Sequence, residues 1–136
     1  MGLSERRAAK AFQDGPFQEL QAKINEAACK ELEIEVDWNS LAIDGMSHMY
    51  EEAFPKVYFL PLIGALQAVC IDDMGKEALA EGLEKVTIQN QQGISSASRW
   101  ATFQNKALVL DHKPITNIDY VKDRTDSLQK LLEDGL

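Results

Sequence analysis

The feature that most constrains the fold is a change of hydrophobic period at Leu32. From there on, apolar and acidic residues alternate: Leu32, Ile34, Val36 and Trp38 are separated by Glu33, Glu35 and Asp37. Successive side chains of a strand point to opposite faces, so the pattern predicts a strand with one apolar and one acidic face. A slip of one residue would bury three carboxylates, each costing roughly several kcal/mol if unpaired. We therefore expect the register of this strand to be fixed.

Helical spacing precedes and follows this strand. Ser4 can begin a first helix that ends near Asp14-Gly15, and Pro16 is well placed to start a second one. After the strand, an apolar stripe starting at Met46 predicts a helix that Pro55 kinks or ends. Residues 59–71 are apolar almost all round, which is typical of a buried central helix. Asp72-Asp73 can then cap another short helix.

The last third of the chain predicts three strands and a helix. Val86 and Ile88 mark one strand, and residues 99–103 and 107–110 flank the short turn Gln104–Lys106 as a hairpin. Apolar residues at helical spacing then run from Ile118 to Leu132. Residues 89–98 form a polar loop between the first and second of these strands.

These elements predict one globular α+β domain over residues 1–136, with the order α-α-β-α-α-α-β-β-β-α. Because three strands follow one another through short links, we expect a mainly antiparallel sheet of about four strands. The early strand adds to the same sheet, and helices cover one face of it, since a sheet with one apolar face must bury that face.

Charge is distributed unevenly along the chain. The formal net charge is −8, and residues 31–84 hold twelve acidic side chains against two basic ones. Such a segment repels phosphate backbones and anionic lipid, so nucleic acid and membrane surfaces are poor partners, whereas a basic protein is attracted. The longest apolar run is too short and too broken to span a bilayer, and no secretory signal is visible, so a cytoplasmic location is expected.

The acidic stripe formed by Glu31, Glu33, Glu35 and Asp37 is the candidate binding site. Period two places these carboxylates on one face of the strand, where they can dock a basic partner. The alternative is structural: on an edge strand, charge prevents edge-to-edge aggregation. With no catalytic motif in the sequence, the favoured hypothesis is a small interaction or regulatory protein, of adaptor, inhibitor or immunity type, rather than an enzyme.

The competing hypothesis is a small enzyme or ligand-binding domain. Its candidate catalytic residues are Asp111 and His112, at the end of the last strand, close to the polar loop 89–98. Histidine titrates near neutral pH and serves as acid or base. A nucleophilic partner for it could be Cys70, although this residue and Cys29 both lie in apolar surroundings that favour two buried, inert thiols.

Two other groups of polar residues are candidate metal ligands. His48 and Glu52 are four residues apart on one predicted helix, and Asp73, Glu77 and Glu81 follow the same spacing on another. Metal sites need three or more suitable ligands, and a solvated helix face explains both groups more simply. No metal and no cofactor is predicted.

Overall fold

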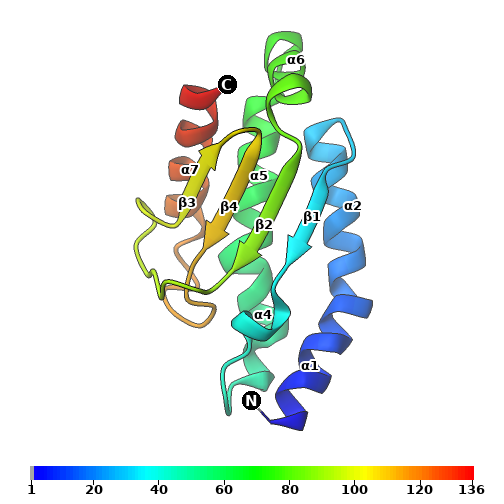
Figure 1. The fold of residues 1–136 in the computed structure, drawn as a ribbon, viewed down its shortest axis with the longest axis vertical. Helices are drawn as coiled ribbons and strands as arrows, with labels where there is room; N and C mark the ends of the chain where they lie inside the picture. The colour runs from blue at the N-terminus through cyan, green and yellow to red at the C-terminus, as the bar shows by residue number, and fades with distance from the viewer. Residues whose placement is uncertain (1) are drawn as a thin grey trace.

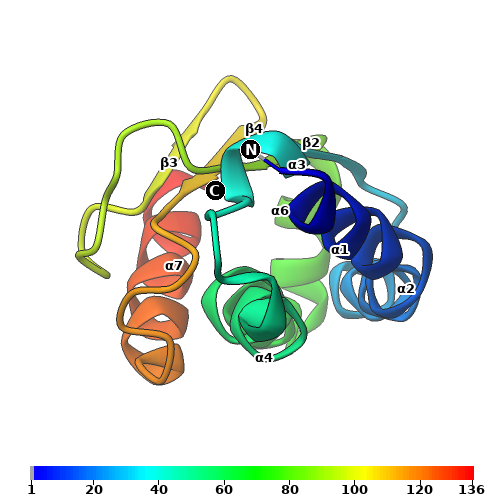
Figure 2. The same cartoon turned by 90° about the horizontal axis from the view of Figure 1, so that it is seen from below.

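A four-stranded sheet carries the long helices of the protein on one of its faces (Figure 1 and Figure 2). The structure, a computed structural model, describes residues 2–136. Helices α2, α5 and α7 lie side by side beneath the sheet, with α5 in the middle. The elements, in chain order, are α1 (Leu3–Asp14), α2 (Pro16–Ala28), β1 (Glu33–Val36), α3 (Trp38–Leu41), η1 (Ser47–Met49), α4 (Tyr50–Phe54), η2 (Pro55–Phe59), α5 (Leu60–Val69), α6 (Asp73–Gly82), β2 (Lys85–Gln89), β3 (Ala101–Gln104), β4 (Ala107–Asp111) and α7 (Val121–Gly135).

The sheet is mixed, which corrects the prediction of a mainly antiparallel one. Its strand order is β1-β2-β4-β3; β1 and β4 both pair with β2 in parallel, and only β3 and β4 pair antiparallel. Short links between strands favour antiparallel neighbours, and this holds for the hairpin alone. The 89–98 loop is long enough to carry the chain past β4, so β3 forms on the far side and β4 returns between β2 and β3.

The β3–β4 hairpin is confirmed, with a turn one residue shorter than predicted, because Gln104 belongs to β3. Asn105 and Lys106 connect the two strands, and both have positive φ angles, 53° and 63°. Two such residues in succession are typical of the two-residue turn whose twist matches that of a hairpin. Asn105 was the residue expected to tolerate this conformation.

Strand β1 lies at one edge of the sheet, as an addition to the later strands. Its residues pair in register with β2, from Glu33 opposite Lys85 to Val36 opposite Ile88. Ile34 and Val36 pack against the core, while Glu33 and Glu35 are exposed. The predicted two-faced strand is therefore present, but it is shorter than the pattern, because Trp38 already begins α3 and packs on the core from there.

The central helix expected over residues 59–71 corresponds to α5, Leu60–Val69, which continues directly from η2. Pro55 neither ends nor breaks the helical path; Tyr50 to Val69 stays helical, with a π-type segment at Pro55–Phe59. The Leu60 amide donates to the carbonyl of Pro55, five residues earlier, which is the spacing of a π-helix and not the four-residue spacing of an α-helix. Proline lacks an amide proton, and a local change of hydrogen-bonding pattern accommodates it.

Aromatic side chains attach the N-terminal helix to this core. The ring of Phe12 lies 5.2 Å from that of Phe54, 5.8 Å from Trp38 and 6.0 Å from Phe59, measured between ring centroids. Such pairs are favourable beyond their buried area. Among the described residues, no helix combines the length and the apolar character needed to cross a membrane.

The two-faced character of β1 gives a stability test. Ile34→Ala is expected to lower the free energy of unfolding by about 1–3 kcal/mol, because a half-buried side chain loses its packing. Glu35→Gln is the matched neighbour on the other face, and we expect it to cost less than about 1 kcal/mol, the value of an exposed ion pair at most. Urea denaturation of the parent and both variants measures this. Equal losses, or a larger loss for Glu35→Gln, would contradict the assigned faces.

Candidate functional site

A polar cluster lies where β2 and β4 end. These parallel strands end at the same edge of the sheet, and the connection from β2 to β3 passes over the end of β4 there (Figure 1). In open sheets with parallel strands, the carboxyl ends are where ligands most often bind. The structure thus brings Asp111, His112 and the 89–98 loop together, as the sequence predicted.

Asp111 holds the crossing loop. Its side chain is buried, with one oxygen accepting from the amides of Gln91 (3.0 Å) and Gln92 (3.2 Å). The other oxygen accepts from the side-chain nitrogen of Gln89 at 3.1 Å. Because a buried carboxylate is costly without such donors, these bonds tie the loop to the strand end. The carboxylate is thereby used to shape the backbone.

His112 lies inside the protein with no exposed surface. Its ring Nδ1 is 2.6 Å from the carbonyl oxygen of Lys113, which assigns the proton to Nδ1 and leaves Nε2 without a hydrogen-bond partner. Burial lowers the pKa of the imidazole, and the charge of Arg124 lowers it further, against opposing contributions from the Lys113 and Ser95 backbones and from Asp111. His112 is therefore neutral at pH 7.

Tyr58 and Trp100 enclose this histidine. The hydroxyl of Tyr58 donates to the carbonyl oxygen of His112 at 2.5 Å, and burial raises the pKa of Tyr58 well above its usual value. The ring of Trp100 stands edge-on to the imidazole, 6.1 Å away between centroids. The Trp100 Nε1 is buried and has no hydrogen-bond partner.

Arg124 is the buried cation of the cluster. Its guanidinium donates to the carbonyls of Asn117 (2.8 Å), Ile118 (2.9 Å) and Lys56 (3.2 Å), and it forms no ion pair with a described carboxylate. Burial lowers the pKa of Arg124, yet an arginine keeps its charge at neutral pH. These bonds tie the start of α7 to the segment before it and to η2.

Sequence reasoning singled out Asp111 and His112 but missed Tyr58, Trp100 and Arg124. Arg124 carried a signal: it falls between Val121 and Leu128 on the stripe that α7 buries, where a charged residue stands out. Tyr58 and Trp100 carry only the general signal of aromatic residues, which favours core packing and is also typical of the lining of a small-ligand pocket, and nothing in the sequence places them beside His112. The cluster contains an acid, an imidazole and a phenol, but a ligand can reach the ring of His112 only if the covering chain moves.

The acidic stripe is divided between structural and free carboxylates. Glu35 pairs with Lys85 across the strands at 2.6 Å. Asp37 accepts from the amide of Ser40 at the start of α3, and its other oxygen accepts from the side chain of Gln91 at 2.6 Å. Among residues 2–136, Glu31 and Glu33 are exposed and lie in no ion pair within 4.0 Å.

The other candidate metal ligands form no metal site among the described residues. Over the described part of the chain, no group of three or more His, Cys, Asp or Glu side chains is arranged to hold a metal ion. Asp72 accepts from the Gly75 amide at 2.8 Å and so caps α6, as predicted. Glu52 lies 3.7 Å from Lys56 in an exposed pair.

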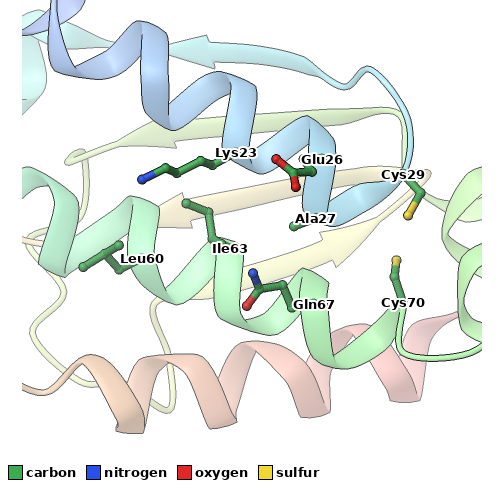
Figure 3. A pocket seen from close by; sticks show the side chains of 8 residues that line it. All are labelled: Lys23, Glu26, Ala27, Cys29, Leu60, Ile63, Gln67 and Cys70. Atoms are coloured by element: carbon green, nitrogen blue, oxygen red, sulfur yellow. The ribbon is translucent and has the colours of Figure 1, made fainter.

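The two cysteines correct an expectation. Cys70 is buried, but Cys29 is exposed, because it follows the last residue of α2 in a left-handed conformation with φ of 57°. Both line a groove of about 630 Å³ between α2 and α5 (Figure 3). Cys70 lies at the end of α5 opposite to the strand ends that carry His112, so the structure does not form the Cys70–His112 pair.

The burial of a neutral His112 predicts a pH-dependent stability. Its folded pKa lies below the unfolded value of about 6.5. Stability from this group is therefore complete above about pH 6.5 and is lost as the pH falls toward the folded pKa, at up to about 1.4 kcal/mol per pH unit. We expect His112→Asn to flatten this part of the pH profile in urea denaturation.

The second histidine of the chain provides the matched control for that profile. His48 is exposed, so His48→Asn is expected to keep the slope of the parent. Because carboxylates also titrate as the pH falls, the quantity to compare is the difference between each variant and the parent. A His112→Asn profile parallel to that of the parent would show that His112 is not held neutral by the fold.

No protein-family model matches this chain, and neither a curated protein nor a solved structure matches it.

Proposed function

We propose that the chain is a small, non-enzymatic interaction or regulatory protein that binds a basic protein partner. The binding surface is the acidic edge, which we define as Glu31, Glu33 and Glu35 at and just before β1. The observation that carries the proposal is that Glu31 and Glu33 are exposed and form no ion pair within 4.0 Å among the described residues, at an edge strand of the sheet. A surface of this sign steers a basic partner toward it.

The backbone of β1 supports this mode of binding. The amides of Glu33 and Asp37 donate to the carbonyls of Glu84, just before β2, and Ile88, on β2, so the alternate residues Ile34 and Val36 direct their backbone groups away from β2. No described strand pairs with that side of β1. An extended segment of a partner can pair with this side of β1 as an additional strand. Main-chain hydrogen bonds then provide affinity, and the acidic side chains favour a partner segment rich in basic residues.

Charge also explains why this edge favours a different protein over a second copy of itself. Two acidic edges brought together place like charges side by side, which is unfavourable and opposes self-association. A segment rich in Lys or Arg reverses the sign of that interaction. The structural role of the charges and the proposed docking role are therefore compatible, since both follow from the same exposed carboxylates.

Charge reversal at the acidic edge is the test. The double variant Glu31→Lys/Glu33→Lys keeps the ion pair of Glu35 with Lys85 and the capping role of Asp37. When the parent protein is used as bait in cell extract at low salt, we expect it to capture basic proteins. The double variant is expected to capture at least about tenfold less of these proteins, and high salt is expected to reduce the amount that the parent captures.

The matched control reverses two exposed acids elsewhere. Asp123→Lys/Glu133→Lys changes the net charge equally but lies on α7, across the molecule from β1 (Figure 1). This control is expected to capture the same basic proteins as the parent. The proposal fails if the parent enriches no basic protein at low salt, or if both double variants lose or keep binding to the same extent.

One observation favours the small-ligand or enzymatic alternative at Asp111 and His112. The ring nitrogens His112 Nε2 and Trp100 Nε1 are buried and make no well-aligned hydrogen bond, although the Ser95 backbone lies near the imidazole, and such nitrogens are uncommon in a closed core. A ligand that displaced the 89–98 loop would meet both. Thermal-shift screening against small metabolites separates the two proposals: a compound that stabilises the parent but not His112→Asn supports a site, and a compound that stabilises both equally opposes it.

A further inference from the structure

The groove between α2 and α5 ends in two thiols that face one another. Cys29 follows the last turn of α2 and Cys70 follows the last turn of α5, and their sulfur atoms point toward each other across the gap (Figure 3). The Cys70 Sγ lies 3.9 Å from the carbonyl oxygen of Ala28, the residue just before Cys29. Residues 41 positions apart in sequence are thus held close by the packing of two helices.

The two thiols differ in access. Cys29 is exposed, so small molecules in solvent reach it directly. Cys70 is only 7% exposed, but it opens into the same groove. Burial raises the pKa of Cys70, and the neighbouring Cys29 raises it further, against a small opposing contribution from Lys76. These surroundings make Cys29 the thiol that reacts first and Cys70 the thiol that reacts second.

We propose that Cys29 and Cys70 are a redox-active pair that forms a reversible disulfide by exchange with a small-molecule disulfide of the glutathione class. The Cys29 thiolate attacks one sulfur of the oxidised glutathione, whose S–S bond breaks, and one glutathione leaves and takes up a proton. Cys70 then loses its proton to solvent and attacks the Cys29 sulfur of the mixed disulfide, releasing the second glutathione. Overall, two protein thiols are oxidised and one glutathione disulfide is reduced to two thiols.

The bond would join the C-terminal end of α2 to the C-terminal end of α5. It closes a loop that contains β1, α3 and the whole helical path to α5, and such a long loop loses much entropy when it is cross-linked in the unfolded chain. Oxidation therefore makes the helical layer more resistant to unfolding without contact with β2, β3 or β4. This property is independent of the proposed binding at the acidic edge.

Treatment of the folded protein with oxidised glutathione at mildly alkaline pH tests the pair. Intact mass is expected to fall by two hydrogens, both thiols become unreactive, and thermal unfolding shifts upward by about 5–15 °C until dithiothreitol reverses it. A parent that stops at the glutathione adduct, forms a covalent dimer or does not react would overturn the proposal.

Single variants assign the two roles. Cys70→Ser is expected to keep a stable glutathione adduct on Cys29, whereas Cys29→Ser is expected to remain unmodified under the same conditions. An adduct on Cys70 in Cys29→Ser that forms as fast as the adduct on Cys29 in Cys70→Ser would overturn the order of attack.

A comparison with the unfolded chain shows whether the fold creates the pair. The parent is equilibrated at a series of reduced-to-oxidised glutathione ratios, with and without denaturing urea. The native protein is expected to keep its disulfide at ratios at least about tenfold more reducing than the unfolded chain does, because the fold raises the effective concentration of one thiol at the other. Equal ratios would show that α2 and α5 do not hold the thiols ready for bonding.

Discussion

The insertion of β4 between β2 and β3 is the constraint on which the rest of the structure depends. Since β2 and β4 run parallel, the chain leaving β2 must travel past the end of β4 before it can begin β3. The loop that makes this passage carries backbone amides over the end of β4, where no neighbouring strand provides carbonyl groups to accept their hydrogen bonds. Asp111 accepts from two of these amides, and the neighbouring His112 amide donates to the carbonyl of Gln89, which closes the same corner.

The buried polar cluster follows from this closure. Once Asp111 is directed to the loop, His112 lies on the opposite side of the backbone and faces the helical layer, where Tyr58 donates to its carbonyl oxygen and the charge of Arg124 lowers the pKa of its ring. The helical layer therefore presents polar groups near the carboxyl ends of β2 and β4, and apolar side chains to the rest of the sheet. Arg124 has no carboxylate partner there among the described residues, and three backbone carbonyls take that role. A single topological choice thus accounts for a buried aspartate and a buried histidine at this end of the sheet.

The elements that sequence could predict are those whose cause is local. The alternation from Leu32 to Trp38 gave the faces of β1, and Asn105 gave the hairpin turn, because both depend on residues close together in the chain. The parallel pairing of β2 with β4 depends on where the 89–98 loop goes, which no local pattern encodes. The same limit applied to the sites: Asp111 and His112 stand together in sequence, whereas Tyr58, Arg124 and the facing thiols of Cys29 and Cys70 meet only through helix packing. The partial neutralisation of the acidic stripe by Lys85 was likewise a consequence of strand register.

The position of β1 has a consequence for the order in which the protein opens. Strand β1 pairs with a single neighbour, and the chain that returns from it to β2 spans residues 37–84. Closing that long connection costs more chain entropy than closing the two-residue turn between β3 and β4. In return, β1 gains only the hydrogen bonds of one short ladder with β2. Fluctuations that release part of the sheet therefore favour detachment of β1 over disruption of the hairpin, and its amides are expected to exchange their protons with solvent before those of β4. The edge of the sheet that carries the free carboxylates is thus also the part of the sheet that the native protein exposes most readily.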